Sequence, residues 1–315
     1  MSTVSAMEIF DRGLVRRRRE RRAAGFGGFD FLKEEVAARL ADRLLDINRS
    51  FPVALDLGCH TGALGRLLLE RPDVETLVSA DLSERMAARA PGRRVAADEE
   101  FLPFADGSLN LVVSALSLHW VNDLPGALIQ INRALRPDGL LLAAMFGGDT
   151  LTELRQALLQ AELAVSDGAG PRVSPFADVR DAGSLLQRAG FALPVTDFER
   201  ITVDYADAFA LMRDLRGMAE ANAVIERHKA PLSRRTLLAA MEAYHDLHAR
   251  ADGRIPATFD VVYLTGWAPH ESQQKPLAPG SAKMRLAQAL GTRERSAGEK
   301  AVPGLGNAPD GTDVR

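Results

Sequence analysis

The stretch from Asp56 to Gly62 reads Asp-Leu-Gly-Cys-His-Thr-Gly and joins a carboxylate to a glycine turn. Gly58 and Gly62 would let a ligand approach the backbone of this turn. The carboxylate of Asp56 suits a ligand ammonium group and opposes a phosphate. The loop therefore predicts a binding site for a cationic small molecule.

Two further acidic positions extend this predicted site. Asp81 follows the apolar run Glu75–Ala80, and a carboxylate there can accept hydrogen bonds from both hydroxyls of a ribose. Asp98 and Glu99 follow a third run, where a carboxylate can accept from an adenine amino group. The order of glycine loop, ribose acid and adenine acid predicts S-adenosylmethionine (SAM), which carries an ammonium and a sulfonium but no phosphate.

The residues expected to contact SAM lie in or beside these strand ends. They are Asp56, Gly58, Cys59, His60, Gly62, Asp81, Leu82, Asp98, Glu99 and Ser114. A dinucleotide site is the main alternative, but its G-x-G-x-x-G loop would need glycine where this chain has His60. A glycine turn with incidental acids is the other.

Short strands and helices alternate from Val53 to Phe146, and this order predicts a parallel sheet that binds ligands at the carboxyl ends of its strands. The expected strands are Val53–Leu57, Glu75–Ala80, Arg94–Ala97, Leu109–Ala115 and Leu140–Phe146. The expected helices between them are Gly62–Arg71, Ser83–Arg89 and Leu124–Leu135. We therefore expect an α/β, Rossmann-like core over residues 49–150.

The flanking segments complete this architecture. Residues 1–48 are expected to form a helical extension, with an amphipathic helix from Phe31 to Ile47 capped by Asp30. Residues 151–285 should add the last two of seven strands, Phe191–Val203 and Thr258–Trp267, and a mostly helical cover over the substrate site. Helices should lie on both faces of the sheet. Residues 291–315 lack apolar periodicity and are expected to be a disordered tail.

Composition narrows the possible functions. The 315 residues carry a formal charge of -3 and a single cysteine, Cys59, so an intramolecular disulfide is excluded. No run approaches the roughly 20 apolar residues of a membrane span, and no signal-peptide core is visible. We expect a soluble protein of a reducing compartment, without a transmembrane segment. No metal site is predicted; His245 and His248 on a predicted helix are the weak alternative.

Six arginines between Arg16 and Arg22 form the one strongly basic run. Such a run is typical of a solvated helix face, and this is the interpretation that we favour. A patch for RNA, anionic lipid or an acidic partner is the alternative. Nucleic acid is not the expected substrate, because Ser114-Ala115-Leu116-Ser117 lacks the Asn/Asp-Pro-Pro-aromatic motif of base methyltransferases.

Several polar and aromatic residues are candidates for the reaction itself. His119 follows the fourth predicted strand and is the candidate general base, although a histidine that orders the loop is the alternative. Trp120, Asp149 and His270 are candidate substrate contacts. Asp149 could bind a guanidinium or cap the helix predicted from Thr150, and Trp120 could equally be packing.

Several motifs resemble the class I SAM-dependent methyltransferase family. They are Asp56-Leu57-Gly58, Asp81, Asp98 with Leu102-Pro103-Phe104, Ser117-Leu118-His119-Trp120 and Leu135-Arg136-Pro137-Asp138-Gly139. A narrower resemblance, over roughly residues 9–285, is to the mitochondrial complex I assembly factor 5 family. It includes Ile9-Phe10-Asp11-Arg12, Asp30-Phe31-Leu32-Lys33 and His119-Trp120-Val121-Asn122-Asp123-Leu124-Pro125. The carrier-protein methyltransferase of biotin synthesis is similar but more distant.

These resemblances imply three functions. The first is methyl transfer from SAM to a small molecule or a protein side chain, in a protein linked to respiratory complex I assembly. The second is hydroxylation of an arginine of an iron–sulfur subunit of respiratory complex I, and the third is SAM binding by a non-catalytic assembly chaperone. The implied location is the cytoplasm, or the mitochondrial matrix for a eukaryotic source. His60 departs from the family, whose members usually carry glycine there.

Overall fold

The computed structural model describes residues 8–165, 168–176, 179–274, 288 and 291–292. The chain divides into two units, Met1–Glu271 and Ser272–Arg315, and the helices and strands named below lie in the first. The tail expected at residues 291–315 falls almost entirely outside the described residues. The description that follows therefore concerns the first unit.

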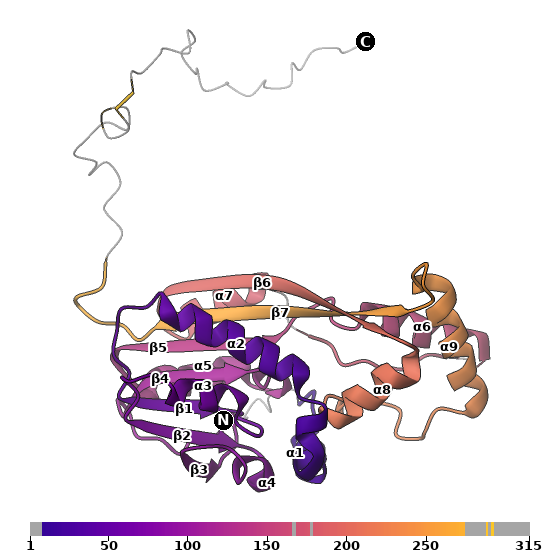
Figure 1. Cartoon of the computed structure of the whole chain (residues 1–315), viewed down its shortest axis with the longest axis horizontal. Coiled ribbons are helices and arrows are strands. Elements are labelled where there is room, and N and C mark those ends of the chain that lie inside the picture. The colour runs from indigo at the N-terminus through magenta and orange to yellow at the C-terminus, as the bar shows by residue number, and fades with distance from the viewer. Residues whose placement is uncertain (1–7, 166–167, 177–178, 275–287, 289–290, 293–315) are drawn as a thin grey trace, which may run out of the picture. The chain divides into compact units, whose positions relative to one another are not determined.

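A seven-stranded sheet forms the centre of this unit, in the order β3-β2-β1-β4-β5-β7-β6 (Figure 1). The strands are β1 (Val53–Leu57), β2 (Thr76–Asp81), β3 (Arg93–Ala96), β4 (Leu109–Ala115), β5 (Leu135–Phe146), β6 (Ala192–Tyr205) and β7 (Ile255–Trp267). Strands β1 to β5 pair in parallel, whereas β7 runs antiparallel to both β5 and β6. The predicted α/β sheet is confirmed.

Helices cover both faces of the sheet because successive strand residues point to opposite sides. Leu111 and Val113 of β4 pack in one apolar cluster with α2 and α3, while Val112 packs in a second cluster with α5 and α7. These helices are α2 (Phe31–Leu45), α3 (Ala63–Leu69), α5 (Leu124–Ala134) and α7 (Val179–Arg188). Both faces of the central strands are therefore buried.

Three more helices gather beyond one end of the sheet, around the long strands β6 and β7 (Figure 1). They are α6 (Thr152–Val165), α8 (Ala208–Gly217) and α9 (Arg234–His248). This end is also where the parallel strands β4 and β5 have their carboxyl ends, at Ala115 and Phe146. The mostly helical cover therefore lies at the edge of the sheet that carries the glycine loop.

Several element boundaries differ from the predictions by a few residues, and two of them show how the fold sets a boundary. Strand β5 begins at Leu135 rather than Leu140, because Leu135 pairs with Leu109 before the register shifts at the turn. Helix α6 begins at Thr152, and the side chain of Asp149 accepts from Arg200 Nη2 at 2.8 Å instead of capping the helix. Asp30 stands at the start of α2 without a side-chain capping bond.

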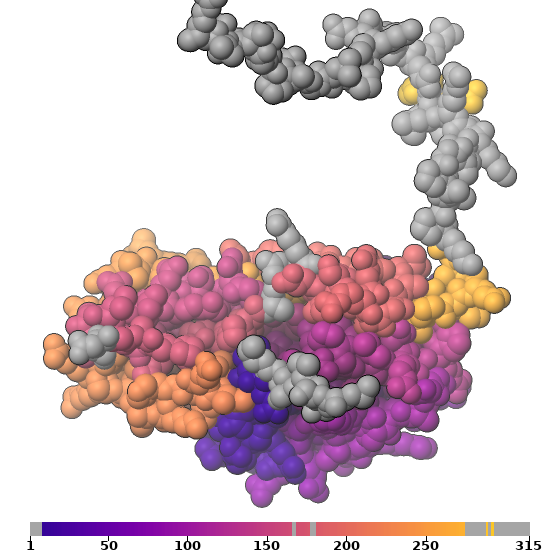
Figure 2. Space-filling model, turned by 180° about the vertical axis from the view of Figure 1, so that it is seen from behind, coloured from indigo at the N-terminus to yellow at the C-terminus, as the bar shows by residue number. Residues whose placement is uncertain are grey.

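The N-terminal segment folds into α1 (Arg12–Arg22), followed by a short turn of 3-10 helix at Ala23–Gly28. Asp11 caps α1 by accepting from the backbone N–H of Leu14. An isolated bridge joins Phe10 to Val224, just after α8. In the space-filling view the indigo surface of this segment lies between the magenta sheet region and the orange α9 region (Figure 2). None of the helices in the described ranges is long and apolar enough to span a bilayer.

Candidate cofactor crevice and neighbouring cavity

The loop after β1 requires glycine at two positions. Gly58 has a φ of +68°, and a Cβ there would stand 2.1 Å from Ser117 Oγ. Gly62 has a φ of +84°, and its Cβ would stand 2.3 Å from Pro91 Cδ. A side chain at either place would displace packed atoms, so the loop stays close to β2 and β4.

Asp56 lies buried under this loop. One carboxylate oxygen accepts from the backbone N–H of Gly65 at 3.0 Å, and the other, Oδ1, has no partner in the described part of the chain. Burial raises the pKa of Asp56 to about 7. The carboxylate lines a cavity of about 10 Å³ together with Gly58, Cys59 and His60, which is space for about one water molecule.

The acids after β2 and β3 meet beside this loop, as predicted from the order of the strands. Asp81 accepts from the backbone N–H groups of Ser83 at 2.8 Å and His60 at 3.0 Å. Glu99 accepts from Ser117 Oγ at 2.6 Å. Both carboxylates are fully buried. Asp98 is half-buried, and the structure thus gives Glu99 rather than Asp98 the inner position.

Two arginines of α1 fill the crevice between these acids. Arg19 Nη1 lies 3.2 Å from Asp81 Oδ2 and 3.1 Å from Glu99 Oε1, and Arg19 Nη2 donates to Ser117 Oγ at 2.8 Å. Arg12 donates to Asp98 at 2.5 Å and also to Glu99. Arg19 is only 1% exposed. The crevice is therefore occupied by guanidinium groups of the chain itself.

The prediction of a solvated arginine run is therefore wrong in part. Arg16, Arg17, Arg21 and Arg22 are exposed, but Arg19 is buried. One helical face of α1 turns toward the buried acids, and paired burial stabilises charges that would be costly to bury alone. Only the fold brings those acids beside the helix.

The ion pairs with Arg12 and Arg19 also determine the protonation of Asp81 and Glu99. Burial alone would raise the pKa of Glu99, but the guanidiniums of Arg12 and Arg19 outweigh it and lower that pKa to about 2. Burial raises the pKa of Asp81, and Arg19 opposes this effect. Glu99 is therefore ionised at neutral pH in this arrangement.

His60 takes the conformation that a glycine would adopt easily. Its φ is +48°, its ring stacks on Phe26 with centroids 5.6 Å apart, and its Nε2 lies 3.3 Å from the carbonyl oxygen of Leu116. Burial lowers the pKa of His60, so the ring is neutral. The imidazole thus packs over the loop.

The other predicted cofactor residues lie nearby but with fewer polar contacts. Cys59 is buried and its N–H donates to Ala80 O at 2.9 Å. Leu82 packs partly against the cluster of Phe10, Val15 and Trp120. Ser114 is buried within β4, and its Oγ has no partner among the described residues. Ser117, which was not predicted as a cofactor residue, contacts Glu99 instead.

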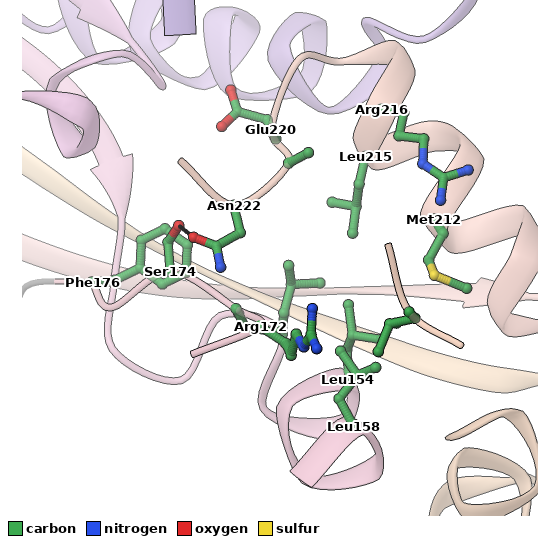
Figure 3. Close-up of a pocket in the computed structure, with 14 residues that line it drawn as sticks. Leu154, Leu158, Arg172, Ser174, Phe176, Met212, Leu215, Arg216, Glu220 and Asn222 are labelled. Carbon is green, nitrogen blue, oxygen red and sulfur yellow. Dashed lines mark hydrogen bonds between the residues drawn. The ribbon is translucent and has the colours of Figure 1, made fainter. Parts of the chain in front are cut away.

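A larger cavity of about 180 Å³ lies between α6, α8 and two loops (Figure 3). Its walls are mainly apolar, from Leu154, Leu158, Met212, Leu215 and Phe176, among others. Polar side chains reach it from Arg172, Ser174, Arg216, Glu220 and Asn222. Ser174 Oγ donates to Asn222 at 3.1 Å, and Arg172 is paired with Glu162 at 2.5 Å. This cavity has the mixed lining of a small-molecule or side-chain site.

His119 and Trp120 stand between the crevice and this cavity. His119 is buried, and its ring centroid lies 4.7 Å from that of Phe146 and 5.9 Å from that of Phe176. His119 Nε2 lies 3.0 Å from Glu220 Oε2, and Trp120 Nε1 donates to the same oxygen at 2.8 Å. Trp120 is 2% exposed, so it acts at least as packing.

Two predicted substrate contacts lie elsewhere. His270 follows β7, whose end pairs with the beginning of β5 at Trp267 and Leu140, so His270 sits at the opposite edge of the sheet from the glycine loop. The antiparallel direction of β7 places His270 away from the glycine loop, so the structure does not bring it together with the other predicted site residues. Asp149 is at the correct edge but is exposed and paired with Arg200 at 2.8 Å.

The sequence missed Arg12, Arg19, Ser117, Lys33 and Glu220. Arg12, Lys33 and Ser117 stand inside motifs that carry the family resemblance, which is a usable signal. Nothing in the local sequence singles out Glu220, which lies in the loop after α8. In the described ranges, no group of three or more His, Cys, Asp or Glu side chains could hold a metal ion, and His245 pairs with Asp246 on an exposed helix end.

Comparison with known proteins agrees with this geometry. A family model described as a methyltransferase domain matches residues 55–143, which span the glycine loop to β5. Two solved structures are similar in fold. The YcgJ protein of Bacillus subtilis has a TM-score of 0.53 at 13% identity, covering 75% of this chain and 99% of that one. A putative methyltransferase of Bacillus halodurans has a TM-score of 0.52 at 16% identity, covering 74% of this chain and 99% of that one.

Curated relatives match nearly the whole chain. The mitochondrial arginine-hydroxylase NDUFAF5 of Danio rerio is 43% identical, covering 91% of each chain, and that of Homo sapiens is 46% identical, covering 90% of this chain and 83% of the relative. The malonyl-[acyl-carrier protein] O-methyltransferase of Laribacter hongkongensis is 39% identical, covering 86% of this chain and 94% of the relative. The chain belongs to the SAM-dependent methyltransferase family and is a member of its NDUFAF5 branch.

Proposed function

We propose that this enzyme binds SAM in the crevice of Asp56, Asp81 and Glu99 and transfers its methyl group to an acceptor held in the neighbouring cavity. The observation that carries the proposal is the meeting of these three carboxylates beside a loop that only glycine can form. Family membership supports the same assignment. The cavity supports it because it opens at the same edge of the sheet, beyond β4 and β5.

The chemistry of these residues fits SAM. The unpartnered Oδ1 of Asp56 could accept from an ammonium group, and Asp81 could accept from ribose hydroxyls. Glu99 could accept from an adenine amino group. The space between them, however, holds the guanidinium of Arg19. SAM binding therefore requires Arg19 to leave the crevice, either by a side-chain rotation or by movement of α1.

When bound, SAM supplies a methyl group on a sulfonium that is already activated for displacement by an acceptor lone pair. The residues of the chain would mainly orient the acceptor and exclude water. The apolar cavity walls would hold the acceptor's body. His119 is the proposed base, because it is buried between crevice and cavity and carries no charge at neutral pH: burial lowers its pKa.

Titration of the purified chain with SAM by calorimetry tests the first half of the proposal. Incubation with methyl-labelled SAM and a cell extract tests the second half. A labelled acceptor that fails to form with His119→Gln supports methyl transfer. Saturable SAM binding without any labelled product would favour a non-catalytic role, and absence of SAM binding would overturn the proposal.

A second candidate is arginine hydroxylation in the assembly of respiratory complex I. Relatives 40–46% identical to this chain carry the name arginine-hydroxylase and are named mitochondrial, and this similarity favours the candidate. The acceptor would then be an arginine of a complex I subunit. The test is mass spectrometry of subunit peptides after incubation with the enzyme. An oxygen-dependent gain of one oxygen atom would support hydroxylation, and a gain of one methyl group would support methyl transfer.

A further inference from the structure

A buried carboxylate, Glu220, accepts from three side chains that come from two separate parts of the chain. Lys33 Nζ on α2 lies 2.7 Å from Glu220 Oε1, while His119 Nε2 and Trp120 Nε1 lie 3.0 and 2.8 Å from Oε2. The side chains of Glu220, Lys33 and His119 are 5%, 4% and 1% exposed. This cluster therefore holds one charge pair and a histidine almost out of contact with water.

The donors determine which ring nitrogen of His119 carries a proton. An ionised carboxylate can only accept hydrogen bonds, and Lys33 and Trp120 can only donate. Lys33 and His119 outweigh the effect of burial and keep the pKa of Glu220 well below its usual range. His119 Nε2 must therefore donate its proton to Glu220. In the neutral ring, Nδ1 is then a bare lone pair, and it has no partner in the described part of the chain.

The cluster also lies where a base would be useful. Glu220 and Phe176 line the cavity, and the Phe176 ring packs against the His119 ring. On the other side, Lys33 Nζ donates to Leu116 O at 3.1 Å, the same oxygen that faces His60 Nε2. Leu116 has a φ of +52°, an unusual backbone conformation of the kind that concentrates at functional sites.

We infer that Glu220 is a positioning residue: it holds His119 in the tautomer whose Nδ1 is free to take a proton from the acceptor, and Lys33 keeps Glu220 ionised. This inference rests on the proposed function, since a base is needed only if the acceptor loses a proton. The acceptor lone pair bonds to the methyl carbon, the carbon–sulfur bond breaks, and its electron pair goes to sulfur. The acceptor proton moves to Nδ1, and Glu220 stabilises the imidazolium that forms.

The tautomer can be observed directly by a long-range ¹H–¹⁵N spectrum of the full chain labelled at histidine. His119→Gln identifies the signals of His119. We expect the wild-type spectrum to show the proton on Nε2 and a bare Nδ1. A spectrum with the proton on Nδ1, or with both nitrogens protonated at neutral pH, would overturn the inference.

Variants separate positioning from packing. Glu220→Gln should give a mixture of His119 tautomers, whereas Trp120→Phe removes the other donor to the same oxygen and should leave the tautomer unchanged. Because Glu220→Gln leaves Lys33 without its counter-charge, the double variant Lys33→Met with Glu220→Gln provides a folded alternative. Circular dichroism verifies folding. A wild-type tautomer in both Glu220→Gln proteins would contradict the assignment.

The pH titration of His119 gives a second test, because a purely packing role of Glu220 would not change the pKa of His119. The charged groups that act on His119 are Glu220, Lys33 and Arg19. Loss of the carboxylate in Glu220→Gln should lower the pKa of His119 further, because burial and the two cations then act unopposed. An unchanged titration curve would show that Glu220 does not act on His119.

Kinetics connect the cluster to turnover. With the acceptor labelled from SAM in extract, Glu220→Gln should lower kcat by about 100-fold, the usual range for loss of general-base catalysis, and leave SAM affinity within about twofold. If SAM does not bind the wild-type chain but the tautomer pattern is as expected, the proposed function fails and the arrangement of the cluster stands. If SAM binds and Glu220→Gln leaves kcat unchanged, the positioning role of Glu220 is overturned while the proposed function stands.

Discussion

The crevice and the cavity of this protein lie at the same edge of one sheet, but they are filled differently. The crevice is walled by Asp81 and Glu99 and is filled by guanidiniums of α1, and the neighbouring space beside Asp56 measures about 10 Å³. The cavity is walled mainly by apolar side chains and retains about 180 Å³. Buried carboxylates need counter-charges, whereas apolar walls do not. Charge thus explains why one hollow is closed by the chain and the other is not.

The two faces of α1 also differ in how their arginines are buried and paired. Arg19 is buried against two acids, while Arg16, three residues earlier, is exposed and pairs with Glu20 at 3.0 Å. Exposed pairs of this kind contribute little to stability. The arginines of one run therefore differ in role according to the helix face on which they lie.

The largest effect should follow from removal of Asp81, the acid proposed to bind the ribose of SAM. Asp81→Ala should weaken SAM binding by about 100-fold, because two hydrogen bonds to a charged acceptor are lost. Calorimetry measures the change, and Asp106→Ala, in an exposed pair with Arg133, is the control. Asp81 also forms an ion pair with Arg19. The double variant Asp81→Ala with Arg19→Met therefore separates the effect of Asp81 on SAM from its effect on Arg19. Unchanged affinity in Asp81→Ala would remove this acid from the site.

Arg19→Met should strengthen SAM binding by about tenfold, because it removes the group that competes for Asp81 and Glu99. The same substitution should lower the melting temperature, since two buried carboxylates lose a counter-charge. Arg16→Met is the matched control on the exposed face and should change neither quantity measurably. Weaker SAM binding by Arg19→Met would mean that Arg19 contacts the ligand rather than competing with it.

SAM affinity should rise about tenfold between pH 6 and pH 8, because the ionised form of Asp56 is the one proposed to bind the ammonium group and burial raises the pKa of Asp56 to about 7. Asp56→Asn should remove this dependence. The contribution of Asp56 to folding stability changes with pH in the opposite direction. Because the pKa of Asp56 is raised in the folded state, Asp56 favours folding at low pH, and this contribution is lost as the pH rises through 7. Affinity that is flat with pH in the wild type would separate Asp56 from the ammonium.

The smallest effect on SAM should come from narrowing the cavity. Met212→Trp on α8 should leave SAM affinity within about twofold, because the cavity is separate from the crevice, but it should suppress labelling of the acceptor. Leu159→Trp on the exposed side of α6 is the control for the added indole. If Met212→Trp weakens SAM and acceptor labelling equally, the two hollows are not independent.

The sequence by itself determined the sheet and the acidic strand ends. Alternating short apolar runs and helices predicted the α/β core, and the order of Asp56, Asp81 and Glu99 along the chain predicted that they meet. This works because parallel strands bring all their carboxyl ends to one edge, so position in sequence fixes position in space. The glycine loop was predictable for the same reason, since its constraint is local.

Only the tertiary structure decided what surrounds those acids. Arg19 lies 62 residues before Asp81, and Glu220 lies 101 residues after His119, so no local pattern links either pair. His270 lies away from the glycine loop because the direction of β7 depends on its pairing with β5, not on its own residues. Long-range ion pairs and strand direction are set by how the elements pack, and a helical run of arginines looks the same whether it faces water or a buried carboxylate.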